Sequence, residues 1–314
     1  MNALTELIKE YLQYCQVRKE LDPKTIRAYR ADLEGFRLHI EGLNGNYLDR
    51  RSIGSYVDVL HQEKAPRTVR RKIASLRAFY NYLTFSEEIE ENPLMRVELS
   101  FKLPQRLPRY IPNHVMKRFY QELYAQRERA NTPYQIKCAV RDIAVIELLF
   151  ATGLRISELC GLRQEAVNLY DGEVRIRGKG DKERILQLTE KITIGALTEY
   201  KLLFQGEISK SEYFFLNKYG NPLSDQSVRD MIDRLAHMAS IPMHITPHMF
   251  RHSFATYLVN QDVDIRCIQE MLGHSSIRTT EIYTHVDMAK QRNVLETKNP
   301  RKLLDMENAL PFGR

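Results

Sequence analysis

The stretch TPHMFRHSFATYL, at residues 246–258, decides the fold class of the second half of the chain. Thr246 followed by Pro247 is typical of a helix start, where a polar cap precedes proline at the first helical position. Apolar side chains then recur at helical spacing. His248 and Arg251 are three positions apart and therefore share one face. The stretch predicts an amphipathic helix that presents an imidazole and a guanidinium together.

Helices continue on the C-terminal side of this stretch, where LGHSSIRTTEIYTHV occupies residues 272–286. Asp264 caps a helix that should end at Gly273, because glycine is favoured just beyond a helix C-terminus. The Ser-Ser pair after His274 starts a last short helix, which runs through Tyr283.

The segment GEVRIRGKGDKERILQL, at residues 172–188, predicts two short antiparallel strands around a Gly-Lys-Gly-Asp turn. Val174 and Ile176 point to one face, and the arginines that alternate with them point to the other. Lys179 lies in the turn. Helical patterns surround this hairpin at residues 113–130, 136–151, 191–204 and 225–239.

The N-terminal third is predicted to be entirely helical. Asp22 before Pro23, and Asp49, each provide a helix start, and apolar residues recur at helical spacing in four segments. Four prolines between residues 92 and 112 predict a linker. The fold class is therefore mainly α with a small antiparallel β-sheet. We divide the chain into a helical domain (1–95), a linker (96–112), a mixed domain (113–291) and a tail (292–314).

One helix of the first domain is strongly basic on one side. From Lys64 to Arg77 there are six basic residues and no acid. By helical-wheel arithmetic these side chains lie opposite or beside the apolar stripe. Basic side chains that neutralise phosphates release counterions, which favours a nucleic-acid surface; a simple solvated face is the alternative. The candidate DNA-binding residues are Arg67, Arg70, Arg71, Lys72 and Arg77.

Composition narrows the class of protein. The chain has 314 residues, a net charge of +7 and no apolar run of membrane-spanning length. Its pI of about 9.1 fits a nucleic-acid partner. Four widely spaced cysteines disfavour a zinc site or a disulfide scaffold and fit a reducing cytoplasm. We therefore expect a cytoplasmic protein without a membrane anchor or secretory signal.

Six side chains stand out as candidates for chemistry. They are Arg155, Lys179, His248, Arg251, His274 and Tyr283. Each taken singly has an ordinary structural explanation. Together, two guanidiniums can grip the oxygens of one phosphodiester, and a lysine in a turn can protonate a leaving alkoxide. A phenol, with a reference pKa of about 10, needs a nearby base and a positive field to act as a nucleophile. Since no acidic set for Mg²⁺ accompanies them, protein cations would stabilise the developing charge. The combination predicts phosphoryl transfer through a phosphotyrosine.

These motifs resemble the tyrosine recombinase (phage integrase) family, and most of all its Xer-type members. The resemblance covers nearly the whole chain and rests on 246–258, 272–286 and the order Arg–Lys–His-x-x-Arg–His–Tyr. It implies a helical, SAM-like core-binding domain followed by an α+β catalytic domain, with the six residues above as the catalytic set. It also implies that Glu158 supports Arg155, and it leaves Lys182 as a weaker alternative to Lys179.

The resemblance further implies a mechanism and partners. Tyr283 would attack the scissile phosphate and form a 3′-phosphotyrosyl link, while Lys179 protonates the departing 5′ oxygen. No ATP, metal or other cofactor is expected. The expected partner is double-stranded DNA with a specific core site. A homo-tetramer, or a heterotetramer with a second recombinase, would bind the paired DNA sites, and the reaction would pass through a Holliday junction. The tail, 292–314, would dock on a neighbouring protomer; folding back onto its own domain is the alternative.

Two other functions stay open. A type IB-like topoisomerase uses similar chemistry, although the helical N-terminal domain and the short ending around Tyr283 disfavour it. A DNA-binding protein without catalysis is the second alternative, and the complete catalytic set disfavours it. Whether a recombinase of this kind would resolve chromosome dimers or move a mobile element is not decided by the residues.

Overall fold

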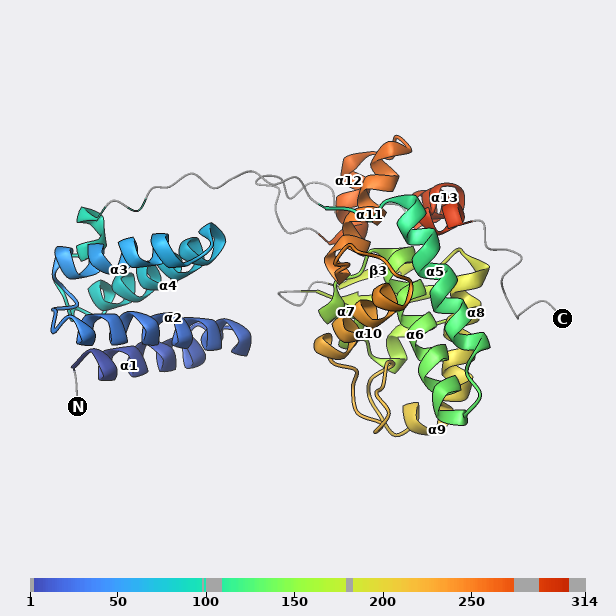
Figure 1. Cartoon of the computed structure of the whole chain (residues 1–314), viewed down its shortest axis with the longest axis horizontal. Helices are drawn as coiled ribbons and strands as arrows, with labels where there is room; N and C mark the ends of the chain where they lie inside the picture. The colour runs from blue at the N-terminus through green and yellow to red at the C-terminus, as the bar shows by residue number, and fades with distance from the viewer. Residues whose placement is uncertain (1–2, 98, 100–108, 179–182, 274–287, 305–314) are drawn as a thin grey trace. The chain divides into compact units, whose positions relative to one another are not determined.

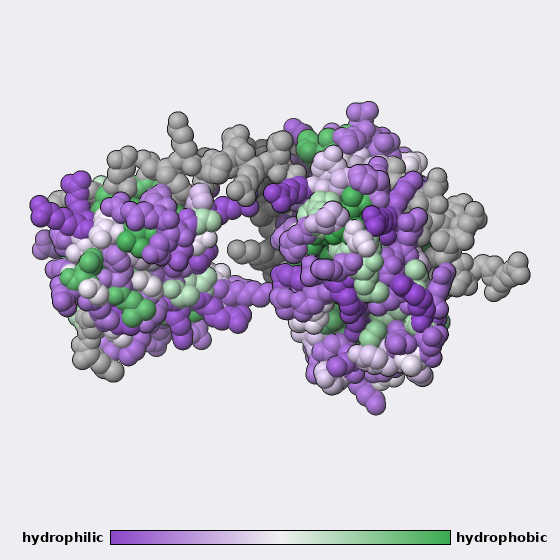
Figure 2. All heavy atoms as spheres, in the orientation of Figure 1, coloured by the Kyte–Doolittle hydropathy of each residue, from purple (hydrophilic) through white to green (hydrophobic). Residues whose placement is uncertain are grey.

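The computed structural model describes residues 3–97, 99, 109–178, 183–273 and 288–304. The chain divides into two compact units, Met1–Arg106 and Leu107–Arg314 (Figure 1). Much of the expected linker lies outside the described residues, so its extent stays a prediction. Hydrophilic residues cover most of the face of each unit that Figure 2 shows.

The described part of the first unit is built from helices, as its sequence predicts. Asp22 accepts a hydrogen bond from the backbone N–H of Lys24 at 2.7 Å, and Asp49 accepts one from Ser52 at 2.9 Å. Both expected helix starts are therefore confirmed. The elements are α1 (Ala3–Val17), α2 (Pro23–Gly42), α3 (Arg50–Glu63), α4 (Pro66–Phe85) and the 3-10 helix η1 (Pro93–Arg96).

Aromatic side chains fill the core of this first unit. Phe36, Phe79 and Tyr80 are fully buried where α2 and α4 pack together. The ring of Tyr11, from α1, meets Phe79 edge-on with centroids 5.5 Å apart. Because each buried aromatic ring removes a large apolar area from water, these contacts fix α1, α2 and α4 as one bundle.

The second unit combines many helices with a small sheet. Its helices are α5 (Asn113–Glu128), α6 (Pro133–Thr152), α7 (Ile156–Cys160), η2 (Gln164–Ala166), α8 (Lys191–Leu203), α9 (Gln205–Ile208), α10 (Asp225–Met238), α11 (Pro247–Asn260), α12 (Ile265–Leu272), α13 (Met288–Lys298) and η3 (Pro300–Leu304). Its strands are β1 (Val167–Asn168), β2 (Glu173–Arg177) and β3 (Glu183–Gln187).

The strands form one antiparallel sheet in the order β1-β2-β3. Val174 and Ile176 are buried while Arg175 and Arg177 are exposed, which confirms the predicted alternation. In the register of the hairpin, Ile176 pairs with Arg184. Arg184 therefore lies on the inward face of the sheet.

Helix α6 runs through the middle of the second unit and contacts α5, α8 and α11 (Figure 1). Almost every residue from Ala139 to Thr152 is buried. A capping box between Thr132 and Gln135 starts the helix, and Gly153, with φ +63°, ends it. This central position holds the C-terminal end of α6 firmly in place.

The C-terminal ends of α6 and α12 lie close together. Gly153 and Gly273 both end their helices in the left-handed conformation, with φ of +63° and +62°. A Cβ atom added to Gly153 would lie 2.8 Å from both Leu272 Cδ2 and Phe254 Cδ1. Glycine is needed at this position for its backbone angle and for the close approach.

Some elements differ from those that the sequence predicts. α7, α9 and β1 are not anticipated, and α13 runs across the expected boundary between 291 and 292. The last short helix, expected through Tyr283, lies outside the described residues. No helix in the described ranges has the length and apolar content to cross a bilayer.

Candidate active site

Arg155 is fixed where the chain leaves α6 and enters α7. Its backbone N–H donates to Glu158 Oε2 at 2.9 Å, and its Nη1 donates to Glu158 Oε1 at 2.8 Å. The carboxylate therefore caps α7 and holds the guanidinium at the same time. Nη2 of Arg155 reaches across to the carbonyl oxygen of Gly273 at 3.0 Å.

Arg251 bridges the two helix ends described above. It lies in the first half of α11 and is only 5% exposed. Its Nη1 donates to the carbonyl of Gly153 at 2.9 Å, and its Nη2 donates to the carbonyl of Leu272 at 2.5 Å. Carbonyls at a helix C-terminus carry partial negative charge, so they stabilise a cation at this point.

Arg184 is a third arginine in the same place, and it is missing from the residues that the sequence predicts. Its Nε donates to the carbonyl of Met271 at 3.1 Å. Its two Nη atoms donate to Glu158 at 3.1 and 2.8 Å. The strand alternation contained the signal, because counting back two residues from buried Leu186 places Arg184 on the inward face.

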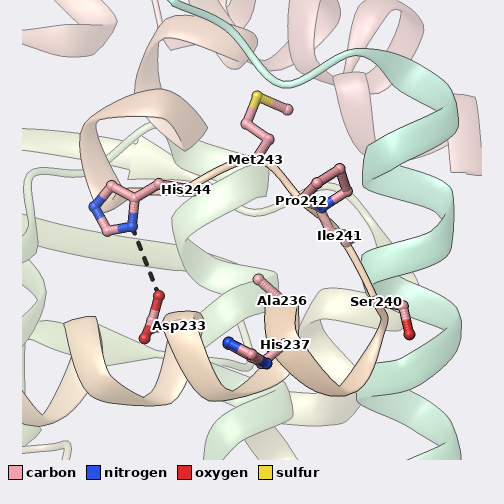
Figure 3. Close-up of a pocket in the computed structure, with 8 residues that line it drawn as sticks. All are labelled: Asp233, Ala236, His237, Ser240, Ile241, Pro242, Met243 and His244. Carbon is pink, nitrogen blue, oxygen red and sulfur yellow. Dashed lines mark ion pairs between the residues drawn. The ribbon is translucent and has the colours of Figure 1, made fainter.

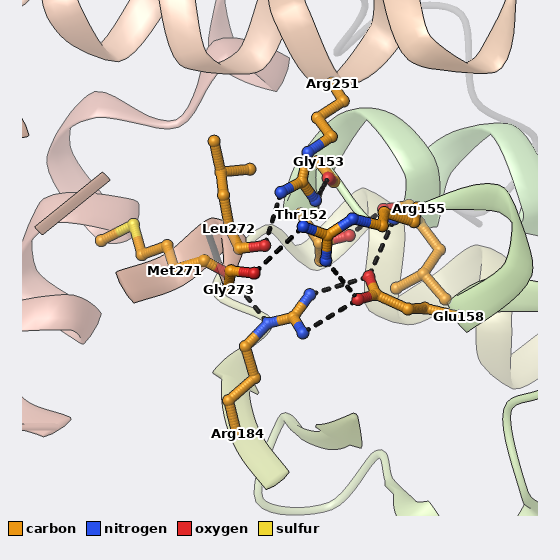
Figure 4. Close-up of polar contacts among 10 residues, drawn as sticks. Thr152, Gly153, Arg155, Glu158, Arg184, Arg251, Met271, Leu272 and Gly273 are labelled. Carbon is orange, nitrogen blue, oxygen red and sulfur yellow. Dashed lines mark hydrogen bonds and ion pairs between the residues drawn. The ribbon is translucent and has the colours of Figure 1, made fainter. Parts of the chain in front are cut away.

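The guanidiniums of Arg155, Arg184 and Arg251 point toward one another beside the end of α12 (Figure 4). They come from the residue that precedes α7, from β3 and from α11, which are far apart in the sequence. Among the residues that the structure describes, three guanidiniums face one carboxylate here, which leaves two positive charges in excess. The arrangement is therefore a cationic centre, not a closed ion-pair network.

The pKa shifts reflect this excess of positive charge. Burial works against ionisation of Glu158, but hydrogen bonds and charges from Arg184 and Arg155 outweigh it and lower the pKa of the carboxyl. Burial and the positive charge of Arg155 lower the pKa of Arg251 to about 10. Arg251 is thus still a cation at neutral pH, but one that an anion would stabilise.

The centre retains donors for such an anion. A guanidinium carries five N–H donors, and the described bonds use two of those on Arg251 and two of those on Arg155. The carbonyls and the Glu158 carboxylate consequently orient the two guanidiniums without using all of their donors. Forked N–H donors match the oxygens of a phosphate. Within the described ranges no three His, Cys, Asp or Glu side chains gather to hold a metal ion.

The remaining predicted residues are placed only in part. His248 is exposed in the first turn of α11, one turn before Arg251. Burial, together with the charges of His248 and Arg251, lowers the pKa of neighbouring His252. Lys179, Lys182, His274 and Tyr283 lie outside the described residues. The structure thus brings Arg155, Glu158 and Arg251 together, and the catalytic roles of the whole set stay predictions.

The basic face of α4 is less uniform than its sequence suggests. Arg71 Nη1 forms an ion pair with Asp32 Oδ2, and Lys72 Nζ lies 3.2 Å from Asp32 Oδ1. Asp32 comes from α2, and its side chain is buried. An acid from another helix therefore partly neutralises two of the five candidates, which the local run of bases could not reveal. The other three, Arg67, Arg70 and Arg77, are exposed.

A separate hollow of about 370 Å³ lies at the end of α10 and the loop that follows it (Figure 3). His244 Nδ1 lies 3.6 Å from Asp233 Oδ1 across it. Because these side chains are 77% and 61% exposed, the pair contributes little. None of the predicted site residues that the structure describes lines this hollow.

Two family comparisons cover most of the chain. Residues 115–290 match the phage integrase family, and residues 8–86 match the phage integrase N-terminal SAM-like domain. The chain therefore belongs to the phage integrase family, whose members are tyrosine recombinases. This result confirms the family and the fold class that the sequence predicts.

Individual relatives agree with this assignment. A tyrosine recombinase of Agathobacter rectalis is 49% identical over 96% of this chain and 99% of its own. Tyrosine recombinase XerD of Listeria monocytogenes is 35% identical over 95% of this chain and 100% of its own.

Solved structures share the fold. XerH recombinase in a pre-cleavage complex with its difH substrate gives a TM-score of 0.67 at 22% identity, covering 91% of this chain and 83% of that one. A lambda integrase tetramer bound to a Holliday junction gives 0.65 at 16% identity, covering 91% and 81%.

Proposed function

We propose that this chain is a site-specific DNA recombinase that cuts and rejoins DNA through a covalent phosphotyrosine. The observation that carries the proposal is the cationic centre, in which, among the described residues, Arg155, Arg184 and Arg251 outnumber the carboxylate of Glu158. A phosphodiester supplies the missing negative charge, and its pentacoordinate transition state supplies more. Membership of the tyrosine recombinase family supports this reading of the centre.

In the proposed reaction the phenol oxygen of Tyr283 attacks the scissile phosphorus. A Tyr–O–P bond forms, and the bond from phosphorus to the 5′ oxygen breaks. His248 helps to move the phenol proton, and Lys179 gives a proton to the leaving 5′ oxygen. Arg155, Arg251 and His274 stabilise the charge on the non-bridging oxygens.

The protein environment would supply the whole of this chemistry. The energy of the broken bond is retained in the phosphotyrosine, so ATP is not required, and the arginines take the part that Mg²⁺ takes elsewhere. The 5′-hydroxyl of a second duplex can then reverse the step.

We assign DNA binding to residues 1–95, catalysis to 113–291 and protomer contacts to the tail, 292–314, joined by the linker at 96–112. Two rounds of strand exchange through a Holliday junction would need four protomers on two duplexes. The solved structures bound to DNA, one of them a tetramer, support this arrangement. From such a substrate we infer that the protein acts in the cytoplasm.

The test begins with duplexes that the full chain selects from a random pool. A nick close to the scissile phosphate lets the short 5′-hydroxyl fragment diffuse away, so that religation fails and a covalent adduct accumulates. We expect wild-type protein to form the adduct and Tyr283→Phe to bind the duplex without forming it. Tyr219→Phe is the matched control, because Tyr219 is 75% exposed on the same unit and should leave the adduct intact.

Each alternative predicts a different result. A DNA-binding protein without catalysis would form no adduct even as wild type, and this outcome would refute the proposal. A topoisomerase would form the adduct and relax supercoiled DNA, but it would not exchange strands between two paired sites. Recombination of a plasmid that carries two selected sites therefore decides between the two enzymes.

A further inference from the structure

Arg184 reaches the contacts shown in Figure 4 from β3, in the lower part of the view. It is the second residue of β3, and its side chain is only 15% exposed. With Nε it holds the carbonyl of Met271, and with both Nη atoms it holds the carboxylate of Glu158. One side chain thus ties the hairpin to α7 and to the end of α12.

The grip on Glu158 fixes more than one ion pair. A two-point contact between guanidinium and carboxylate defines the plane and the direction of the carboxylate. The same carboxylate oxygens accept from the side chain and the backbone N–H of Arg155, at 2.8 and 2.9 Å. The orientation of Arg155 therefore depends on Arg184 through Glu158.

The contacts of the three arginines follow the backbone in order. Arg184, Arg251 and Arg155 donate to the carbonyls of three consecutive residues, Met271, Leu272 and Gly273 respectively. Gly273 in turn precedes the predicted catalytic His274. Arg184 consequently contributes to fixing the end of α12, two residues before Gly273.

Stability alone does not account for a third arginine here. Its charge adds to a site that already carries excess positive charge, and a desolvated cation costs several kcal/mol. A Cβ atom at Gly273 would lie 2.8 Å from Arg184 Nη1, so the backbone is shaped around this guanidinium. Apolar residues of similar volume would stabilise the same contact between β3 and α12 at lower cost.

We propose that Arg184 is a positioning residue for strand cleavage, which holds Glu158 and through it Arg155 at the scissile phosphate. This inference rests on the proposed function. Arg184 acts through its neighbours and is not itself assigned a contact with DNA. Because a misplacement of about 1 Å costs on the order of 100-fold in rate, loss of the grip should slow the chemical step by about that factor.

The first test separates chemistry from binding. Arg184→Gln should lower the single-turnover rate of adduct formation on the nicked duplex by about 100-fold, with far less effect on DNA affinity. Arg184→Lys should recover part of the rate, since lysine keeps the charge but lacks the fork. Arg229→Gln is the matched control, because Arg229 pairs only loosely with Asp225 at 3.8 Å and is 48% exposed.

A purely structural role would give another pattern. Arg184→Gln would then lower the melting temperature or the fraction of active protein, while active molecules would cleave at the wild-type rate. A wild-type rate constant for Arg184→Gln, taken from the time course and not from the amplitude, would overturn the proposal.

The second test asks whether the effect passes through Arg155. On an Arg155→Gln background, Arg184→Gln should slow the reaction little further, because the group that it positions is already gone. If the two losses multiply fully, Arg184 acts independently of Arg155 and the proposal is wrong.

An anion-binding measurement keeps this inference distinct from the proposed function. Arg184→Gln and Arg184→Lys should both weaken the binding of inorganic phosphate to the full chain, because lysine keeps the charge but lacks the fork that orients Glu158, whereas Arg229→Gln should not. If wild type forms no adduct but this pattern holds, the recombinase function fails and the positioning of Arg155 stands. Phosphate affinity unchanged by Arg184→Gln would overturn the positioning itself.

Discussion

Replacement of Arg301 by methionine tests the buried ion pair between Arg301 of η3 and Glu147 of α6. Arg301 Nε lies 3.0 and 2.9 Å from the two carboxylate oxygens of Glu147, and the two side chains are 2% and 0% exposed. The carboxylate also accepts from Tyr124 at 2.5 Å and from Thr193 at 3.1 Å. The guanidinium lies over the ring of Tyr120, 4.9 Å from its centroid. Arg301→Met would leave Glu147 buried without its cation.

The magnitude follows from that burial. Removing one partner of a buried pair costs about 3–5 kcal/mol, because the remaining charge stays out of water. The hydrogen bonds from Tyr124 and Thr193 remain, so we expect the lower end, about 3 kcal/mol. In a unit as large as Leu107–Arg314, each kcal/mol lowers Tm by about 2–4 °C. The second unit should therefore melt about 10 °C lower.

Calorimetry of a double-mutant cycle provides the measurement. Arg301→Met and Glu147→Gln should each be destabilising, while the double variant should be far less so than their sum. Arg292→Met is the matched control, since Arg292 pairs with Glu296 at an exposed site and should change Tm little. An Arg301→Met variant with the Tm of wild type would show that the ion pair between Arg301 and Glu147 does not stabilise the second unit.

The same assay bears on the tail, whose docking on a neighbouring protomer stays a prediction. In this structure Arg301 and Glu147 belong to one chain. The loss from Arg301→Met should then be independent of protein concentration. If a second protomer supplies Arg301, the difference between variant and wild type should grow with concentration, because association stabilises only the wild type.

Three further predictions concern Glu158, the basic helix and the end of α6. Because the pKa of Glu158 is lowered in the folded chain, the ionised carboxylate stabilises the fold fully above its ordinary pKa of 4.5. This stabilisation is lost as the pH falls through the lowered pKa. In urea unfolding, the difference in free energy of unfolding between wild type and Glu158→Gln should therefore be largest at neutral pH and should disappear in acid. A difference that does not vary with pH contradicts the ion pairs of Glu158 with Arg155 and Arg184. Arg70→Ala should weaken DNA binding and reduce its salt slope by about one. Arg71→Ala should in addition lower the Tm of the first unit, because buried Asp32 loses one of its two ion pairs and keeps the one with Lys72; equal melting of the two variants would count against the Arg71–Asp32 pair. Gly153→Ala should lower the free energy of unfolding by at least about 1–2 kcal/mol, since φ is +63° and the added Cβ is crowded. An unchanged midpoint of chemical denaturation would show that the ends of α6 and α12 can move apart to accept the Cβ.

The sequence predicts helix starts well where a single residue caps the helix. The Asp22-Pro23 pair and Asp264 specify their helices through short-range hydrogen bonds, which depend on neighbours in the sequence and on little else. The left-handed glycine that ends α12 is predictable for the same reason. Short elements such as α7 and β1 give no periodicity to recognise, since α7 has five residues and β1 has two.

Charge partners across the fold could not be predicted in this way. Arg71 and Lys72 belong to a run of bases without acids, yet Asp32 reaches them from a different helix. Arg184 stands beside a glycine-rich turn, where a solvated base is the usual case. Its inward direction follows from strand register, but its two partners depend on how α7 and α12 pack against the hairpin.

The end of α12 explains how three arginines can be crowded into one place and still attract an anion. A helix C-terminus contributes roughly half a negative charge, and Glu158 contributes a full one, so the repulsion among the guanidiniums is offset only in part. A second carboxylate would offset most of the remaining positive charge and stabilise the folded chain further. It would also remove the attraction for a phosphate at the atoms that need it. The backbone carbonyls therefore hold Arg251, and together with Glu158 hold Arg155, in fixed directions while leaving most of the positive charge for the substrate.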